Sequence, residues 1–264
     1  MRNLDNDPHS RLNKVANILL TYGWRLASSG AETRVIMQAL YEMARALDAF
    51  YPEITLTSTV LTIKICDNQS LYAICYKSIH KLGINMSSLT RLYQLGKSVS
   101  AGKITDLDEI YHKVRAIRPT HYNKSMLVAL EAIAASCFAY CNGGNLNVCL
   151  AAFFGGSVLM FTRFFFISKG YFENIAFMLS AFFGCFVTYI VSAFILKASL
   201  SEIELSVMAT TLLLVPGFPY MNGFLDVIKG YLAIGSQRLF YSVLLTASAS
   251  IGLLGALCIM HGYR

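Results

Sequence analysis

The chain has 264 residues, of which 55% are hydrophobic and only 14% are charged, and its formal net charge is +7. Soluble domains carry roughly 25% charged residues, so this composition excludes an ordinary soluble protein. The basic residues are scattered and match no nucleic-acid-binding motif. Attraction to an anionic membrane surface accounts for the positive charge, and no nucleic-acid partner is expected.

The charges are concentrated in the first half of the chain. Only six of the 22 Lys and Arg residues and five of the 15 Asp and Glu residues lie after residue 124. The sequence therefore predicts an α-helical integral membrane protein, with a cytoplasmic α+β domain at residues 1–121 and a membrane domain at residues 122–264. The polar N-terminal segment lacks the apolar stretch of a signal peptide.

Two amphipathic helices are predicted at the start of the N-terminal domain. Their apolar residues recur every three or four positions, at Leu12, Val15, Leu19, Tyr22 and Leu26 in the first helix and at Ile36, Leu40, Met43, Leu47 and Phe50 in the second. Between them, Ser29-Gly30-Ala31-Glu32 has the spacing of a capping box, in which Ser29 and Glu32 would satisfy free amides of the second helix. The alternative is that Glu32 and Arg34 form a charged site that faces the membrane domain.

A β-hairpin and two further helices complete the predicted N-terminal domain. The strands are residues 53–66, which are rich in β-branched side chains, and residues 71–78, and the turn-forming residues 67–70 join them. Apolar residues with helical spacing follow Gly83, and Thr105-Asp106-Leu107-Asp108 is expected to cap a further helix, which Pro119 stops.

The membrane domain contains five apolar segments, each close to or above the roughly 20 residues that a helix needs to cross a bilayer. They lie near residues 122–141, 146–166, 175–196, 205–233 and 239–260. Gly155 and Gly156 in the second segment allow close helix packing. Loop basic residues are more frequent on the side of the N-terminal domain, so the N-terminus is expected in the cytoplasm and the C-terminus outside.

The fourth apolar segment is interrupted at residues 216–219, which read Pro-Gly-Phe-Pro. Each proline removes an amide donor and clashes with the preceding turn of a helix. In lipid, such breaks are tolerated where the backbone is buried in protein or lines a wet cavity, and transporters build substrate sites from them. Pro216, Gly217 and Pro219 are therefore predicted to shape a substrate pathway, and a kink that only shapes packing is the alternative.

Polar residues of the membrane domain supply further candidates for this pathway. Asn222 and Asp226 follow the break and are candidates for hydrogen bonding and for gating or proton transfer. Glu131 is the other intramembrane carboxylate and a functional candidate by its position, unless it lies close enough to the interface to snorkel. Three basic residues are expected to attract anions at the inner mouth: Arg163, Lys229 and Arg238.

The seven cysteines and five histidines show no metal-binding spacing, and there is no CxxC pair. We expect no metal, no cofactor and no structural disulfide. Because no nucleophile–base pair or nucleotide-binding loop is visible either, an enzyme is not expected.

Several motifs together resemble the threonine/serine exporter family, and within it the inner-membrane YjjP-type subunit of the split exporters. They are Ser29–Glu32, Gly83–Met86, Asn142–Gly144, and Leu212–Pro219 followed by Asn222, Asp226 and Lys229-Gly230. The resemblance implies a bacterial inner-membrane location, a cytoplasmic N-terminal domain and five spans. It also implies a separate small membrane partner of the YjjB type. Assembly into an oligomer is also allowed.

The resemblance implies export of threonine and serine or, for the split type, of succinate; because the chain resembles the split type, a dicarboxylate such as succinate is the expected substrate. A dianion that leaves an inside-negative cell gains about 4.6 kcal/mol per 100 mV, so it needs no coupled ion. A zwitterionic amino acid gains nothing and would need proton coupling, for which Asp226 or Glu131 are the candidates. A membrane-anchored binding or scaffold subunit is the remaining alternative.

Overall fold

The computed structural model describes residues 8–66, 72–79 and 83–262, and it divides the chain into two compact units. The first unit contains residues 1–121 together with residues 219–239. The second contains residues 122–218 and 240–264. Each unit is described by itself, and the turn predicted at residues 67–70 lies outside the described residues.

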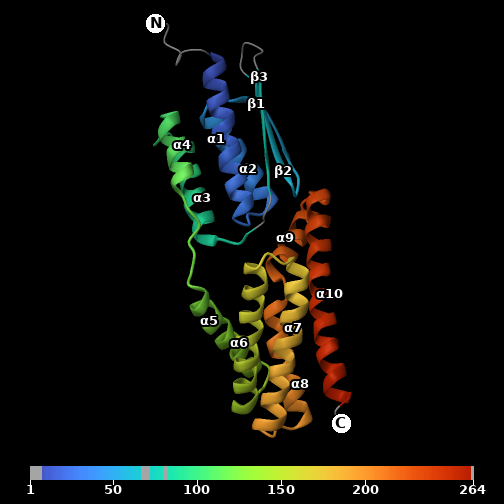
Figure 1. Cartoon of the computed structure of the whole chain (residues 1–264). Helices are drawn as coiled ribbons and strands as arrows, with labels where there is room; N and C mark the ends of the chain where they lie inside the picture. Colours follow the sequence, from blue (N-terminus) through green and yellow to red (C-terminus); the bar gives the residue numbers. More distant parts are fainter. Residues whose placement is uncertain (1–7, 67–71, 80–82, 263–264) are drawn as a thin grey trace. The chain divides into compact units, whose positions relative to one another are not determined.

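The first unit is built on the two amphipathic helices that the sequence predicts. Its elements are α1 (Pro8–Ser28), α2 (Thr33–Ala46), β1 (Phe50–Leu56), β2 (Val60–Cys66), β3 (Tyr72–Ser78), α3 (Met86–Ser100), α4 (Leu107–Ala116), α9 (Gly217–Ile228) from Pro219 onward, and the start of α10 (Leu232–Gly262). Helix α1 packs against the sheet and against α3 and α4 (Figure 1). The predicted helix faces form the core, with the exception of Phe50, which is 40% exposed and lies in β1.

The sheet has three antiparallel strands in the order β1-β2-β3, so the prediction of a two-stranded hairpin is wrong. Residues 53–66 form two strands because Thr57 makes a turn: its hydroxyl accepts from the Val60 amide at 3.0 Å, and its own amide donates to the Val60 carbonyl. One face of β2 carries Leu61, Ile63 and Ile65, each 0% exposed, against the helices.

All the regular elements in the described part of the second unit are helices. It contains α5 (Lys124–Cys141), α6 (Leu146–Ser168), α7 (Glu173–Ile190) with the π-helix η2 (Val191–Ile195), α8 (Leu200–Thr211) with the 3₁₀ turn η3 (Leu212–Leu214), the first two residues of α9, and α10 from Phe240 onward. Within the described residues, four helices are long and apolar enough to cross a membrane, or up to five if α8–η3 and α9 form one broken span.

Small residues bring the helices of the second unit close together. A Cβ added at Gly155 would lie 1.7 Å from the Thr188 hydroxyl, and one at Gly156 would lie 2.9 Å from the Ala135 side chain. The prediction of close packing at these two glycines is confirmed. Two pairs of hydroxyl groups also join α7–η2 to α8. The side-chain oxygens of Thr188 and Thr210 lie 3.0 Å apart, and those of Ser192 and Ser206 lie 3.1 Å apart.

The helix bounds around the break differ from the predicted ones. Helix α9 begins at Gly217, so Pro219 lies in its first turn, where the missing amide donor costs no helical hydrogen bond. The helix ends at Ile228, and α10 begins at Leu232, earlier than the predicted residue 239. Gly230, with φ +86°, makes the turn between them.

Candidate functional site

The loop between α1 and α2 presents backbone groups toward the interior of the first unit. Helix α1 ends in a Schellman motif, in which the Gly30 amide donates to Ala27 and the Ala31 amide donates to Leu26. Gly30 has φ +91°, a conformation that side chains disfavour. Glu32 is then the residue before the first turn of α2, which begins at Thr33.

A second tight connection joins α9 to α10. The Gly230 amide donates to the Val227 carbonyl, and the Tyr231 amide donates to the backbone carbonyl of Asp226 at 2.8 Å. This is again a Schellman arrangement. The two helices meet closely, because a Cβ added at Gly235 would lie 2.8 Å from the Val227 amide nitrogen and 2.8 Å from the Gly223 carbonyl oxygen. Residues 219–239 thus form a compact helical hairpin, which we call the α9–α10 hairpin.

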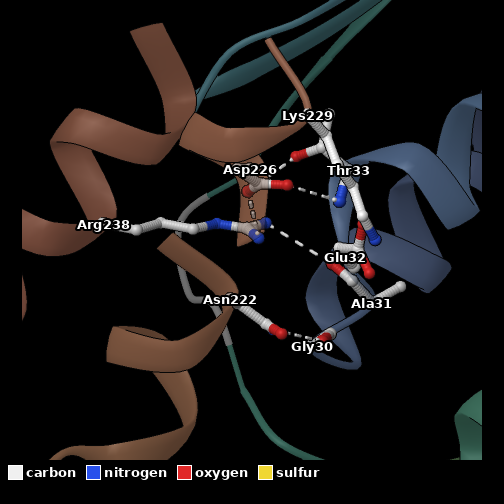
Figure 2. A network of polar contacts seen from close by, with 8 residues as sticks. All are labelled: Gly30, Ala31, Glu32, Thr33, Asn222, Asp226, Lys229 and Arg238. Carbon is white, nitrogen blue, oxygen red and sulfur yellow. Dashed lines mark hydrogen bonds and ion pairs between the residues drawn. The ribbon is translucent and has the colours of Figure 1, made fainter. Parts of the chain in front are cut away.

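Asp226 is the centre of the polar contacts between the hairpin and the loop (Figure 2). Its Oδ1 accepts from the Thr33 amide at 3.2 Å. Its Oδ2 accepts from the Thr33 hydroxyl at 3.0 Å and from Arg238 Nη1 at 2.8 Å. The carboxylate therefore holds α2, α9 and α10 together.

These groups are removed from solvent. The residue exposure is 0% for Asp226, 1% for Thr33 and 7% for Arg238. The first amides of a helix have no partner within the helix, and the helix dipole favours a negative charge beside them. A buried charge is tolerated when it is paired and hydrogen-bonded, and both conditions hold for Asp226.

A second ion pair and two carbonyl contacts extend the network. Lys229 Nζ lies 2.5 Å from Glu32 Oε1, and their side chains are 27% and 15% exposed. Asn222 Nδ2 donates to the Gly30 carbonyl at 3.0 Å, and Arg238 Nη2 donates to the Ala31 carbonyl at 3.4 Å. The two acids and two bases of the network balance in charge.

The structure brings several predicted site residues into this network and leaves others out. Gly30, Glu32, Asn222, Asp226, Lys229 and Arg238 take part. Ser29 is buried beside them, and its carbonyl accepts from the Asn85 amide. Arg34 is exposed on α2, and Pro219 begins the hairpin segment.

The remaining predicted residues belong to the second unit. Pro216 is buried at the break and Gly217 is exposed. Glu131 is partly buried on α5. Arg163 lies 3.5 Å from Glu173 and stacks over the ring of Phe177 at 4.5 Å.

Sequence reasoning missed Thr33 and assigned the wrong cap to α2. The predicted capping box is absent, since the N-cap residue Glu32 makes no side-chain cap bond and its carboxylate pairs with Lys229. The capping box does not form because Ser29 and Gly30 terminate helix α1. The predicted alternative, a charged site of Glu32 and Arg34 that faces the membrane domain, stays a prediction: Glu32 pairs with Lys229, and Arg34 is exposed on α2. The position of Thr33 at the start of α2 could have identified it, because its backbone amide has no partner within the helix and its hydroxyl is a second donor beside that amide.

The donor set suits a carboxylate better than a metal. Arg238, the Thr33 hydroxyl and the Thr33 amide are all donors, and they converge on one carboxylate. Among the described residues, no group of three or more His, Cys, Asp and Glu side chains could hold a metal ion.

Comparisons with known proteins match this chain over most of its length. The family model described as "Putative threonine/serine exporter" matches residues 17–260. A protein of Klebsiella aerogenes named "Probable succinate transporter subunit YjjP" is 27% identical over 241 residues, which cover 90% of this chain and 91% of the relative. The protein of that name in Escherichia coli K12 is 26% identical over 247 residues, covering 93% and 94%. No solved structure matches.

The family and these relatives are described as transporters and not as enzymes. Several apolar helices, four or up to five of them candidate membrane spans in the described part, fit a multi-pass membrane protein. The chain belongs to the threonine/serine exporter family.

Proposed function

We propose that this chain is a subunit of an inner-membrane exporter that moves a small dicarboxylic acid, succinate or a close analogue, out of the cytoplasm. The observation that carries the proposal is the similarity, over about nine-tenths of the chain, to two proteins named as succinate transporter subunits. The buried network supports it, because Arg238 and Thr33 offer donors that suit carboxylates.

Electrostatics makes a dicarboxylate a reasonable substrate for export. A dianion gains about 4.6 kcal/mol per 100 mV when it leaves an inside-negative cell. Export therefore proceeds without a coupled ion, and the protein has to supply only a selective path. The residues proposed for this path are Asn222, Asp226 and Arg238 of the network, together with the break at Pro216 and Gly217.

The word "subunit" in the relatives' names motivates a proposed partner. We propose a small membrane protein of the YjjB type, which completes the exporter. We also propose that the N-terminus is cytoplasmic and the C-terminus is outside, as the loop charges favour. Labelling with a membrane-impermeant maleimide tests this orientation. In intact cells, we expect the reagent to label a variant whose single cysteine is Cys141. A second variant, with Lys169→Cys as its single cysteine, should be labelled only after the cells are permeabilised.

Threonine and serine export is a second candidate, favoured by the description of the family. A zwitterion gains nothing from the membrane potential, so its export would require proton coupling. Asp226 and Glu131 would then be the residues to examine first.

Release of labelled substrates from cells that lack their own exporters tests the proposal. Cells would be loaded with labelled succinate and labelled threonine and would express the chain alone or with the small partner. We expect succinate release only when both proteins are present. Release of threonine instead would identify threonine as the substrate and would require proton coupling. Release of neither compound would favour a binding or scaffold subunit.

A further inference from the structure

We propose that a groove between α2 and α3 binds a small organic ammonium ion, whose charge Glu42 holds. The groove lies wholly within the first unit and has a volume of about 320 Å³. Ligand pockets in proteins measure roughly 300–1,000 Å³, so the groove has room for a small molecule. Its lining residues are separate from those that the described contacts place around Asp226. It is therefore a second site.

The lining of the groove combines apolar side chains with one negative charge. Val35 and Ala39 of α2 and Leu89 of α3 supply the apolar part. Glu42 is the one charged residue among the described residues that line the groove. A carboxylate beside apolar side chains complements a ligand with a cationic head and a short apolar body, and it repels a dicarboxylate. The groove is therefore not a further site for the acid that is proposed to be transported.

The Glu42 carboxylate has an oxygen available for a ligand. Gln38 Nε2 donates to Glu42 Oε1 at 3.0 Å, and within the described part of the chain Oε2 accepts no hydrogen bond. The ring of Tyr93 also lines the groove, but Lys97 Nζ already lies 5.4 Å from its centroid. The carboxylate rather than the ring must therefore hold the charge of the ligand.

A buried hydroxyl near the groove lacks a partner. Tyr22 on α1 is 0% exposed, and among the described residues its hydroxyl makes no hydrogen bond. The hydroxyl lies against α3 at Gly96, about one turn after Tyr93, since a Cβ added at Gly96 would be 2.1 Å from its oxygen. Burial raises the pKa of Tyr22, and the charges of Glu42 and Tyr93 raise it further, which agrees with a position close to these two lining residues.

An ammonium ion suits this hydroxyl as well as the carboxylate. A buried hydroxyl without a partner is unfavourable, and an ammonium N–H can donate to its oxygen. Tyr93, which lies between the solvent and this part of α3, is 41% exposed, so its ring is free to move aside. We therefore assign Glu42 to the charge of the ligand and Tyr22 to one of its N–H groups.

Thermal unfolding of the purified full chain in detergent tests the groove, with n-pentylamine as the probe at neutral pH. A ligand that binds only the folded state raises the midpoint with its concentration. We expect a saturable rise with pentylamine and none with pentanol or pentanoate, which have the same apolar body without a positive charge. An equal rise with all three compounds, or no rise with pentylamine, would overturn the proposal.

Substitutions in the groove locate the probe. Glu42→Gln should raise the half-saturating pentylamine concentration at least about tenfold, because a charge-assisted bond is lost. Glu109→Gln removes an exposed acid on α4 and should leave that concentration unchanged. Thr90→Trp fills the groove from an exposed lining position, and it serves the same test if Glu42→Gln does not fold. Native half-saturation in both groove variants would overturn the proposal.

Tyr22→Phe tests the buried hydroxyl. Because the hydroxyl has no partner in the described part of the ligand-free chain, its removal should not lower the ligand-free midpoint. The half-saturating pentylamine concentration should rise at least about threefold, since one hydrogen bond is lost. Tyr76→Phe, at an exposed position on β3, is the matched control and should change neither quantity. A lower ligand-free midpoint with an unchanged half-saturation would overturn the assignment of Tyr22.

Discussion

Asp226 caps helix α2 through Thr33, which lies 193 positions earlier in the chain. The carboxylate accepts from both the amide and the hydroxyl of Thr33, and Arg238 neutralises its charge at 2.8 Å. A helix start that usually relies on its own neighbours thus relies on a residue of the α9–α10 hairpin. The stability of the N-terminal unit is therefore linked to the presence of that hairpin.

Removal of the Asp226 carboxylate should destabilise the chain strongly. Asp226→Ala leaves Arg238 buried without its carboxylate partner, and breaking such a pair costs about 3–5 kcal/mol. Asp226→Asn should cost less, because its amide oxygen can still accept from Thr33. The free energy of unfolding of the full chain in detergent is the measurement.

The control for this prediction is Glu32→Gln, which removes the more exposed ion pair of the same network. A partly exposed pair contributes about 1 kcal/mol or less. Equal losses in Asp226→Ala and Glu32→Gln would show that burial does not set the importance of the two pairs.

Gly235→Ala should loosen the α9–α10 hairpin. The added methyl group would lie 2.8 Å from backbone atoms of both Val227 and Gly223, and overpacking of this kind costs about 1–3 kcal/mol. Gly217→Ala is the matched control, because its added methyl group would meet no atom within 4 Å apart from its chain neighbours and its own helix backbone. Protease sensitivity of the hairpin should rise in the first variant only, and an equal rise in both would contradict the close packing.

The Thr188–Thr210 pair should couple α7 to α8 energetically. Thr188→Val removes one hydroxyl of a buried pair, whereas the double variant with Thr210→Val removes both. Interhelical hydrogen bonds in membrane proteins average about 0.6 kcal/mol and reach about 1.7. A double-mutant cycle on unfolding free energies should give a coupling in that range, and strictly additive losses would show that each hydroxyl acts only through its own helix.

Cys75 should react slowly with maleimides at neutral pH. Burial raises the pKa of its thiol to about 11, and the thiol donates to the Ala16 carbonyl at 3.3 Å. Only the thiolate reacts, so the labelling rate of a variant that keeps only Cys75 should rise about tenfold per pH unit up to pH 11.

The same shift has a consequence for stability. The folded thiol holds its proton more tightly than the unfolded one, so the stability from this group is complete below pH 9 and falls between pH 9 and 11. Cys75→Ala should remove this part of the pH dependence. A labelling rate that is already constant above pH 9 would contradict the raised pKa.

The sequence was sufficient to predict the elements in which apolar periodicity is strong. The faces of α1 and α2 are buried as expected, and Asp106 caps α4 by accepting from the Glu109 amide at 3.0 Å. The division of residues 53–66 into two strands was missed, because Thr57 turns the chain with its hydroxyl, and no Gly, Pro or Asn marks that turn.

The capping-box pattern shows the limit of local reasoning about the site. Ser199 and Glu202 have the S-x-x-E spacing and form the box at the start of α8. Ser29 and Glu32 have the same spacing and do not, because the end of α1 uses the intervening Gly30 and Lys229 takes the Glu32 carboxylate. The sequence supplied both acids and both bases of the network, but their pairing depends on a contact between distant segments.

The most direct test of the central claim is the initial rate of labelled succinate release from cells that express the chain with the proposed small partner. Native protein, Arg238→Gln and Arg34→Gln would be compared at equal amounts in the membrane. Arg34 is the control, because it is exposed on α2 beside the network. We predict a loss of at least about tenfold in Arg238→Gln, equivalent to about 1.4 kcal/mol, and a native rate in Arg34→Gln. Native rates in both variants would contradict a role for the buried network in carboxylate export.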